Sequence, residues 1–168
     1  IPARGTAEMK YTVTAAQGLW GKNRYWATPQ INGKAYKNAD GDSRICMTAF
    51  TRENFSRMSE EEKDNGPMPK FTTSTFQAGK VKQGETVHAE FTFTNDGKTP
   101  FNVYKVDADA CRWSHSDIPS CNPGQKISFR VHIDTSKMQK GEMLTIVTLT
   151  TNCPLRPVIN LFVAGWIE

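Results

Sequence analysis

The sequence has no apolar run approaching the roughly 20 residues of a membrane-spanning helix, and no basic and then apolar leader. Between Phe71 and Ile167 it also lacks a phosphate-binding loop, a paired general acid and base, and a nucleophile signature. Ser114-His115-Ser116-Asp117 contains the residue types of a catalytic triad, but a triad is defined by geometry, and neighbours in a loop need not converge. These absences predict a protein that is not an enzyme and needs no cofactor.

The residues that are present between Phe71 and Ile167 predict strands rather than helices. From Thr86 to Asn95 apolar and polar residues alternate, as in a sheet with one buried face. We expect Asn95-Asp96-Gly97 to reverse the chain into a hairpin with the next strand. Short strands joined by Gly, Pro and Asn turns predict an all-β fold, an immunoglobulin-like antiparallel β-sandwich. The further strands are expected over Phe101 to Ala108, Lys126 to Ile133, Met143 to Thr150 and Pro157 to Ile167.

The stretch Asn65-Gly66-Pro67-Met68-Pro69 is a linker by composition. We therefore place a domain boundary there, with residues 1–66 as a smaller, mostly β N-terminal segment and residues 67–168 as the sandwich. Asn32-Gly33 predicts a hairpin in the N-terminal segment, and Ser59 to Glu62 has the pattern of a capping box. The other elements expected there are strands over Ala7 to Thr14 and Arg44 to Phe50, and a short helix over Thr51 to Met58.

Several stretches of the sandwich together resemble one protein family. They are Phe76 to Val87, Phe91 to Gly97, Pro123-Gly124, Thr151-Asn152 and the terminal Leu161-x-Val163-x-Gly165-x-Ile167. As a set they resemble the DUF1573 family of immunoglobulin-like domains, which are similar to ASH and MSP-like modules. The resemblance implies an exported protein of the kind common in Bacteroidetes, in the periplasm or on the cell surface. A start at Ile1 agrees with a processed mature chain.

The chain has four cysteines, and the expected strand directions bring Cys111, Cys121 and Cys153 to one pole of the sandwich. An even count in an exported chain favours disulfides, although connectivity does not follow from sequence. Our first choice is Cys111–Cys121 together with Cys46–Cys153. The alternative is a metal site made by Cys111, His115, Cys121 and Cys153, whose spacing is not that of a paired CxxC motif. We therefore expect disulfides and no bound metal.

Charge and aromatic residues concentrate near the start of the chain. Residues 1–58 hold nine Lys and Arg against four acidic residues, interleaved with aromatic residues that include Trp20, Tyr25 and Trp26. Such a surface can stack on sugars, so these three aromatics are candidates for glycan binding. The other interpretation is that the aromatics serve as core and the lysines are solvated. Nucleic acid is not expected as a partner of an exported protein. His88 and His132 are expected to lie singly on solvated strand faces.

The last expected strand is apolar on both faces, because Phe162, Ala164 and Trp166 occupy the side opposite the core. Phe162 and Trp166 should therefore be covered by the N-terminal segment or by a partner protein. The function that we expect is a non-catalytic protein-interaction or structural module of the cell envelope, as an accessory subunit of a larger complex. The alternatives are a module that binds glycan or another envelope polymer, and a metal-handling or redox protein.

Overall fold

The structure is a computed structural model, and it describes residues 5, 6, 8, 10–14, 18–37, 41, 43–110 and 112–168. The chain divides into two compact units, Ile1–Thr51 and Arg52–Glu168. This division falls earlier than the linker around Pro67, so residues 52–66 group with the sandwich. Whether the sandwich folds without residues 52–66 stays a prediction.

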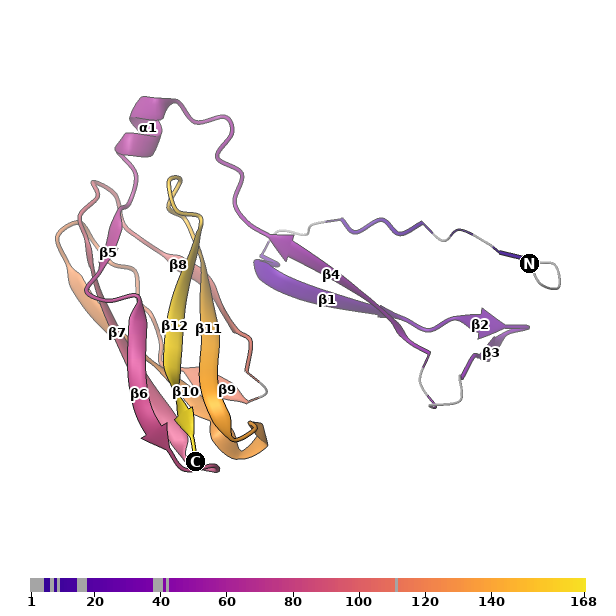
Figure 1. Ribbon diagram of the computed structural model, residues 1–168. Helices are drawn as coiled ribbons and strands as arrows, with labels where there is room; N and C mark the ends of the chain where they lie inside the picture. Colours follow the sequence, from indigo (N-terminus) through magenta and orange to yellow (C-terminus); the bar gives the residue numbers. More distant parts are fainter. Residues whose placement is uncertain are drawn as a thin grey trace. The chain divides into compact units, whose positions relative to one another are not determined.

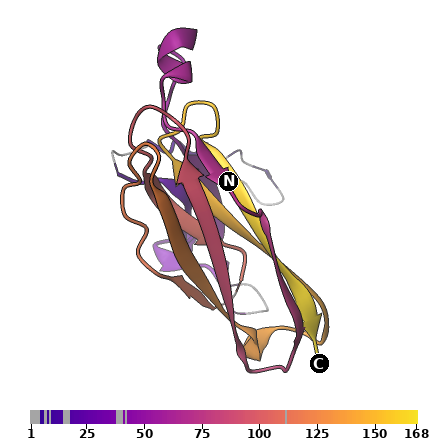
Figure 2. The same ribbon diagram turned by 90° about the vertical axis from the view of Figure 1, so that its left-hand side faces the viewer.

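The second unit is a sandwich of two four-stranded sheets (Figures 1 and 2). All paired strands are antiparallel except β6 and β12, which are parallel. The all-β immunoglobulin-like prediction is therefore confirmed. One sheet has the order β5 (Pro69–Phe71), β7 (Thr86–Asn95), β10 (Lys126–Asp134) and β9 (Trp113–His115). The other sheet has the order β6 (Thr75–Val81), β12 (Val158–Ile167), β11 (Gly141–Thr151) and β8 (Val103–Ala108). A 3-10 turn, η1 (Thr135–Lys137), follows β10.

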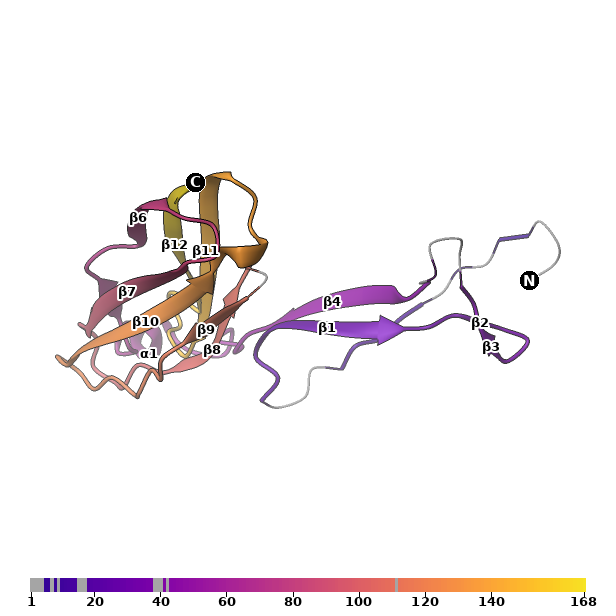
Figure 3. The ribbon, with the colours of Figure 1, turned by 90° about the horizontal axis from the view of Figure 1, so that it is seen from below.

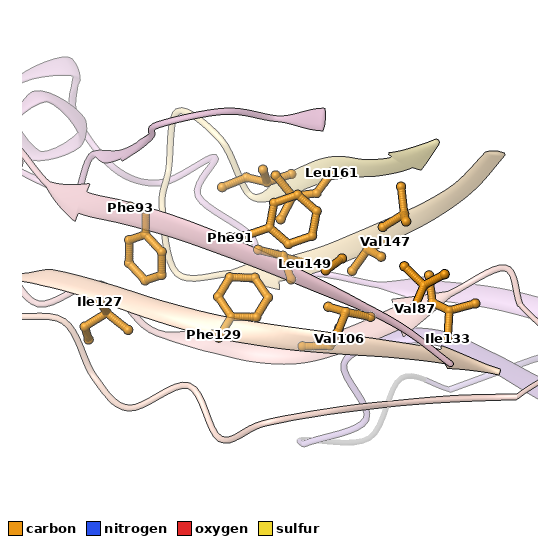
Figure 4. Packing of buried hydrophobic residues seen from close by; sticks show 14 of the residues in the cluster. Val87, Phe91, Phe93, Val106, Ile127, Phe129, Ile133, Val147, Leu149 and Leu161 are labelled. Carbon is orange, nitrogen blue, oxygen red and sulfur yellow. The ribbon is translucent and has the colours of Figure 1, made fainter. Parts of the chain in front are cut away.

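The core lies between the inner faces of the two sheets (Figure 4). On β7 and β10 every second residue is buried, as the alternation predicted. Phe93 lies among aromatic rings, with centroids 5.1 Å from Phe71, 5.3 Å from Phe101 and 6.4 Å from Phe129. The buried side chains that face these rings from the other sheet include Val147, Leu149, Ile159, Leu161 and Val163.

The predicted hairpin between the strands around Phe91 and Val106 is wrong. β7 pairs with β5 and β10, whereas β8 pairs with β11 in the opposite sheet. The cause lies in the turn, where the buried Asn95 side chain accepts hydrogen bonds from Met68 N and Gly97 N and donates to Thr99 O and Cys121 O, over 2.8–3.1 Å. These bonds hold the turn against other parts of the sandwich, so the chain crosses to the second sheet instead of folding back.

Residues 52–66 form an irregular segment that ends in one short helix. α1 (Glu60–Asp64) begins with the predicted capping box, because Glu62 N donates to Ser59 Oγ and Ser59 N donates to the Glu62 carboxylate. The helix expected over Thr51 to Met58 is not formed. Asn54 Oδ1 accepts a hydrogen bond from Ser56 N, and this local turn competes with helical hydrogen bonding.

The first unit is a β-ribbon rather than a layered domain. β1 (Gly21–Ala27) pairs antiparallel with β4 (Ile45–Thr51), which agrees with the predicted strand there. β2 (Gln30–Ile31) and β3 (Lys34–Ala35) form the predicted Asn-Gly hairpin, in which Asn32 and Gly33 have φ of 50° and 74° (Figure 3). The strand predicted over residues 7–14 is absent from its described part, residues 8 and 10–14, and residues 7 and 9 lie outside the described residues.

Candidate protein-interaction face

The outer surface of the second sheet carries a contiguous group of apolar side chains. Ala164 lies opposite Leu144, and Phe162 lies opposite Ile146, on the paired strands β12 and β11. Each alternates with a fully buried neighbour, so these side chains point away from the core. Trp166 is 53% exposed and Leu144 is 59% exposed. We call Leu144, Ile146, Phe162, Ala164 and Trp166 the apolar outer face.

Charged groups of both signs border the apolar outer face. Glu142 lies opposite Trp166 on one side, and Lys80 of β6 lies opposite Trp166 on the other. Lys80 Nζ is 3.1 Å from the Glu168 carboxylate. At the other end of the face, Asp109 accepts a 2.7 Å hydrogen bond from Ile146 N. The border therefore has a mixed charge, and the centre of the face has none.

The structure places three of the four cysteines, and Cys111 lies outside the described residues. Cys46, Cys121 and Cys153 are free thiols, and no disulfide joins any two of them. The predicted Cys46–Cys153 bridge is therefore absent. Its physical reason is the position of Cys153, which is fully buried inside the sandwich and donates to Pro67 O over 3.0 Å, whereas Cys46 is exposed on β4. The Cys111–Cys121 pairing involves a residue that the structure does not describe.

The two buried thiols have properties of structural rather than reactive cysteines. Cys121 Sγ donates to Gln125 O over 3.2 Å. Burial raises the pKa of the Cys121 thiol and the pKa of the Cys153 thiol, so both stay protonated at neutral pH. A thiolate is the form that binds metals and attacks electrophiles, so these environments oppose both reactions.

The alternative metal site is not assembled by the residues that the structure describes. Within those residues, no three His, Cys, Asp or Glu side chains are grouped so that they could hold a metal ion. His115 lies on the edge strand β9, where its ring stacks on Trp113 at 6.0 Å between centroids. Its Nδ1 donates to Ser116 O over 2.8 Å, which occupies the nitrogen that a triad would need for its acid.

The three candidate glycan-binding aromatics do not form one platform. Tyr25 and Trp26 are neighbours on β1 and therefore point to opposite faces of the ribbon. Trp26 is 55% exposed, and the Arg44 guanidinium lies 4.8 Å from the centroid of its ring. Trp20 is half-buried just before the strand. A flat array of all three rings is therefore excluded by the register of the ribbon.

The sequence interpretation missed one pair of residues. His88 and His132 do not lie singly, because the β7–β10 register places them directly opposite each other. Their Nδ1 atoms are 2.6 Å apart, and their rings are edge to face with centroids 4.8 Å apart. The signal in the sequence was a histidine on the polar face of each strand. This signal indicates a pair of histidines only when β7 and β10 are known to be neighbours. The predicted hairpin places a different strand beside β7.

Comparisons with known proteins identify the family of this chain and a solved structure with a similar fold. A family model described as "Protein of unknown function (DUF1573)" matches residues 69–165, so the chain belongs to this family, as its residues predicted. No curated protein matches the sequence.

Two solved structures are similar to this chain to different degrees. A protein of unknown function from Porphyromonas gingivalis W83 has a TM-score of 0.68 at 16% identity, over 90% of this chain and 68% of that chain. The ASH/PapD-like domain 7 of human CEP192 has a TM-score of 0.49 at 8% identity, over 71% of this chain and 97% of that one. At 16% identity the likeness to the Porphyromonas gingivalis protein concerns the fold alone. In the described part of the chain, no helix has the length and apolar character needed to span a membrane.

Proposed function

We propose that this protein is a non-catalytic module of the cell envelope that binds another protein through the apolar outer face. One observation carries the proposal: five apolar side chains from two neighbouring strands lie together on a solvent-facing surface, and Leu144 and Trp166 are each more than half exposed. An outward sheet face that faces only water normally carries polar residues. Exposed apolar patches of this kind mark interaction sites, and tryptophan is enriched among residues that dominate binding energy.

The chemistry of the face indicates which kind of partner fits. The face has no charge at its centre and charges of both signs at its border, so a charged polymer has nothing to recognise there. We therefore infer a different protein with an apolar surface of its own, to which this module adds an accessory contact.

The family supports the proposed location. DUF1573 domains are common in exported proteins of Bacteroidetes, so we place the interaction in the periplasm or at the cell surface. The chain offers its partner a sheet surface, on which an apolar helix or a second sheet can pack. The module would then act as a structural subunit of a larger envelope complex.

The test is site-specific photo-crosslinking from the full chain in its native cells. A photoreactive phenylalanine analogue replaces Trp166 or Leu144 in two variants, and Lys126 on the outer surface of the other sheet in a control. We expect one protein to be crosslinked from positions 144 and 166 and not from position 126. Its binding to the purified chain should fall by roughly 30-fold or more in Trp166→Ser, since an aromatic anchor contributes about 2 kcal/mol or more to an interface.

Three outcomes contradict the proposal. They are no crosslinked protein from either position, the same protein crosslinked from all three positions, and unchanged binding of the purified partner by Trp166→Ser and Leu144→Ser. A crosslink between two copies of this chain would replace the inferred partner by self-association. The Lys126→Ala variant should bind the partner as the parent chain does.

A further inference from the structure

The His88–His132 pair lies on the outer surface of the first sheet, away from the apolar outer face. The residues on either side of each histidine are buried in the core: Val87 and Ala89 on β7, and Val131 and Ile133 on β10. Both imidazoles are therefore held on the solvent side of the sheet by the alternation of the two strands. The strands are central in their sheet, so the backbone that carries the pair is rigid.

The two imidazole rings contact each other through the same atom, Nδ1. Their Nδ1 atoms are 2.6 Å apart, with the rings at 75° to each other. In the neutral pair, the Nδ1–H of one ring donates a hydrogen bond to the Nδ1 of the other. Replacing that proton by a metal ion requires the two nitrogens to move apart and the two rings to turn until both Nδ1 lone pairs point at the ion.

The distance between the nitrogens discriminates among metals. A metal–nitrogen bond is about 2.0–2.1 Å, so two nitrogens at a right angle around one ion are about 2.9 Å apart, and two at a tetrahedral angle are about 3.4 Å apart. From 2.6 Å, the first arrangement needs a smaller opening of the pair than the second. Square-planar or tetragonal coordination is the preference of Cu²⁺ and Ni²⁺, and Cu²⁺ has the higher intrinsic affinity for nitrogen ligands.

We propose that His88 and His132 form a two-histidine binding site for a divalent late transition metal ion, with Cu²⁺ as the best fit. Both imidazoles ligate the ion through Nδ1, and solvent completes the coordination. The nearest carboxylates on this face are engaged by arginines. Glu90 Oε2 is 2.8 Å from Arg130 Nε, and Asp134 Oδ2 is 3.6 Å from Arg112 while its Oδ1 accepts from Ser136 N. The site is therefore an exchangeable one with two protein ligands.

Metal binding at this pair would raise the stability of the folded protein. The two histidines are 44 residues apart in the chain, so the unfolded protein does not hold them together. An ion that binds the folded form alone raises its stability in proportion to the logarithm of the free metal concentration. The ion would crosslink β7 to β10, the strands that supply Phe91 and Phe129 to the core.

The experiment is a Cu²⁺ titration of the full chain by calorimetry, with accessible thiols first blocked by N-ethylmaleimide and with a parallel Zn²⁺ titration. The variants are His88→Gln, His132→Gln and, as the matched control, His115→Gln on the edge strand. We expect one Cu²⁺ per chain, with weaker binding of Zn²⁺. Each variant of the pair should lose roughly 100-fold or more in affinity for Cu²⁺, because the second ligand acts at a high effective concentration. His115→Gln should bind as the parent chain does.

A second measurement separates ligation from a structural effect. Cu²⁺ should raise the thermal midpoint of the parent chain and of His115→Gln, and leave His88→Gln and His132→Gln unchanged, while all four melt alike in a chelator. The electron paramagnetic resonance spectrum of the Cu²⁺ form should show two nitrogen ligands. The proposal is overturned if Cu²⁺ does not bind, if the pair variants bind it as tightly as the parent, or if His115→Gln loses binding to the same degree. A failure here leaves the apolar outer face unaffected.

Discussion

The Tyr104 hydroxyl donates a 2.6 Å hydrogen bond to the Glu53 carboxylate. It links β8 of the sandwich to the irregular segment before α1, across 51 positions of the chain. A second contact of the same kind joins Lys98 Nζ to Asn65 Oδ1 over 2.6 Å. Side-chain hydrogen bonds therefore hold residues 52–66 on the second unit, although this segment contributes no fully buried apolar side chain among those described.

The Tyr104–Glu53 hydrogen bond predicts a loss of stability at high pH. Burial and then the nearby Glu53 carboxylate raise the pKa of Tyr104 above its ordinary value near 10. The folded form therefore holds its proton more tightly than the unfolded form, so this contribution is complete below pH 10 and is lost as the pH rises above 10. Urea unfolding at pH 8, 10 and 11 measures the effect.

The variant Tyr104→Phe should be less stable than the parent by about 1 kcal/mol at pH 8 and should lose less stability between pH 10 and 11. The control is Tyr25→Phe on β1 of the first unit. An equal dependence on pH in Tyr104→Phe and the parent would show that Tyr104 is not the titrating group.

Gly97 should not tolerate a side chain. A Cβ at this position would lie 2.4 Å from both Gly66 O and Met68 N, and the φ of Gly97 lies outside the left-handed region. The glycine is therefore required by close packing of two backbone segments. We expect Gly97→Ala to lower the free energy of unfolding by roughly 1–3 kcal/mol, measured by urea denaturation. Asp96→Ala, next to it with a half-exposed side chain, should change it by less than about 0.5 kcal/mol. Equal stabilities would contradict the packing argument.

The described thiols should differ in reactivity. Cys46 is exposed, whereas Cys121 and Cys153 are buried and their pKa values are raised. Under native conditions N-ethylmaleimide should label Cys46 rapidly and the other two at least roughly 100-fold more slowly, because the buried thiols become accessible only on unfolding. Peptide mapping by mass spectrometry reads each site separately. A peptide that joins Cys46 to Cys153 would contradict the structure.

The sandwich should fold without the first unit. Every residue of the buried hydrophobic cluster lies at Val81 or beyond, and Phe71 is the first partly buried hydrophobic residue that packs against it. Fragments that begin at Arg52 and at Pro67 should both give cooperative thermal unfolding. The shorter one should be less stable by about 1–2 kcal/mol, because it loses the hydrogen bonds of Glu53 and Asn65. If only the longer fragment folds, residues 52–66 are part of the folding unit and the boundary at Pro67 is wrong.

The sequence predictions for the strands with clear alternation, β7, β10, β11 and β12, are confirmed. Val87, Phe91 and Phe93 recur at a period of two and are buried together, and the last strand has its core side and its outer side where the pattern placed them. Ser59 and Glu62 form the capping box because both partners lie within one turn. Such patterns are read from neighbouring residues, so no knowledge of the rest of the fold is needed.

The sequence by itself determined the strands with clear alternation, β7, β10, β11 and β12, which of their faces is buried, and that Trp166 lies on an apolar outer side, because alternation records the burial of each strand locally. Only the tertiary structure decided which strands are neighbours. Each strand can pair with several others, and contacts between residues far apart in the chain decide which pairs form. The hydrogen bonds of Asn95 with Met68 and Cys121 are such contacts. Three features follow from that pairing. His88 lies opposite His132, the strand of Leu144 lies beside the strand of Trp166, and the Cys153 thiol is buried.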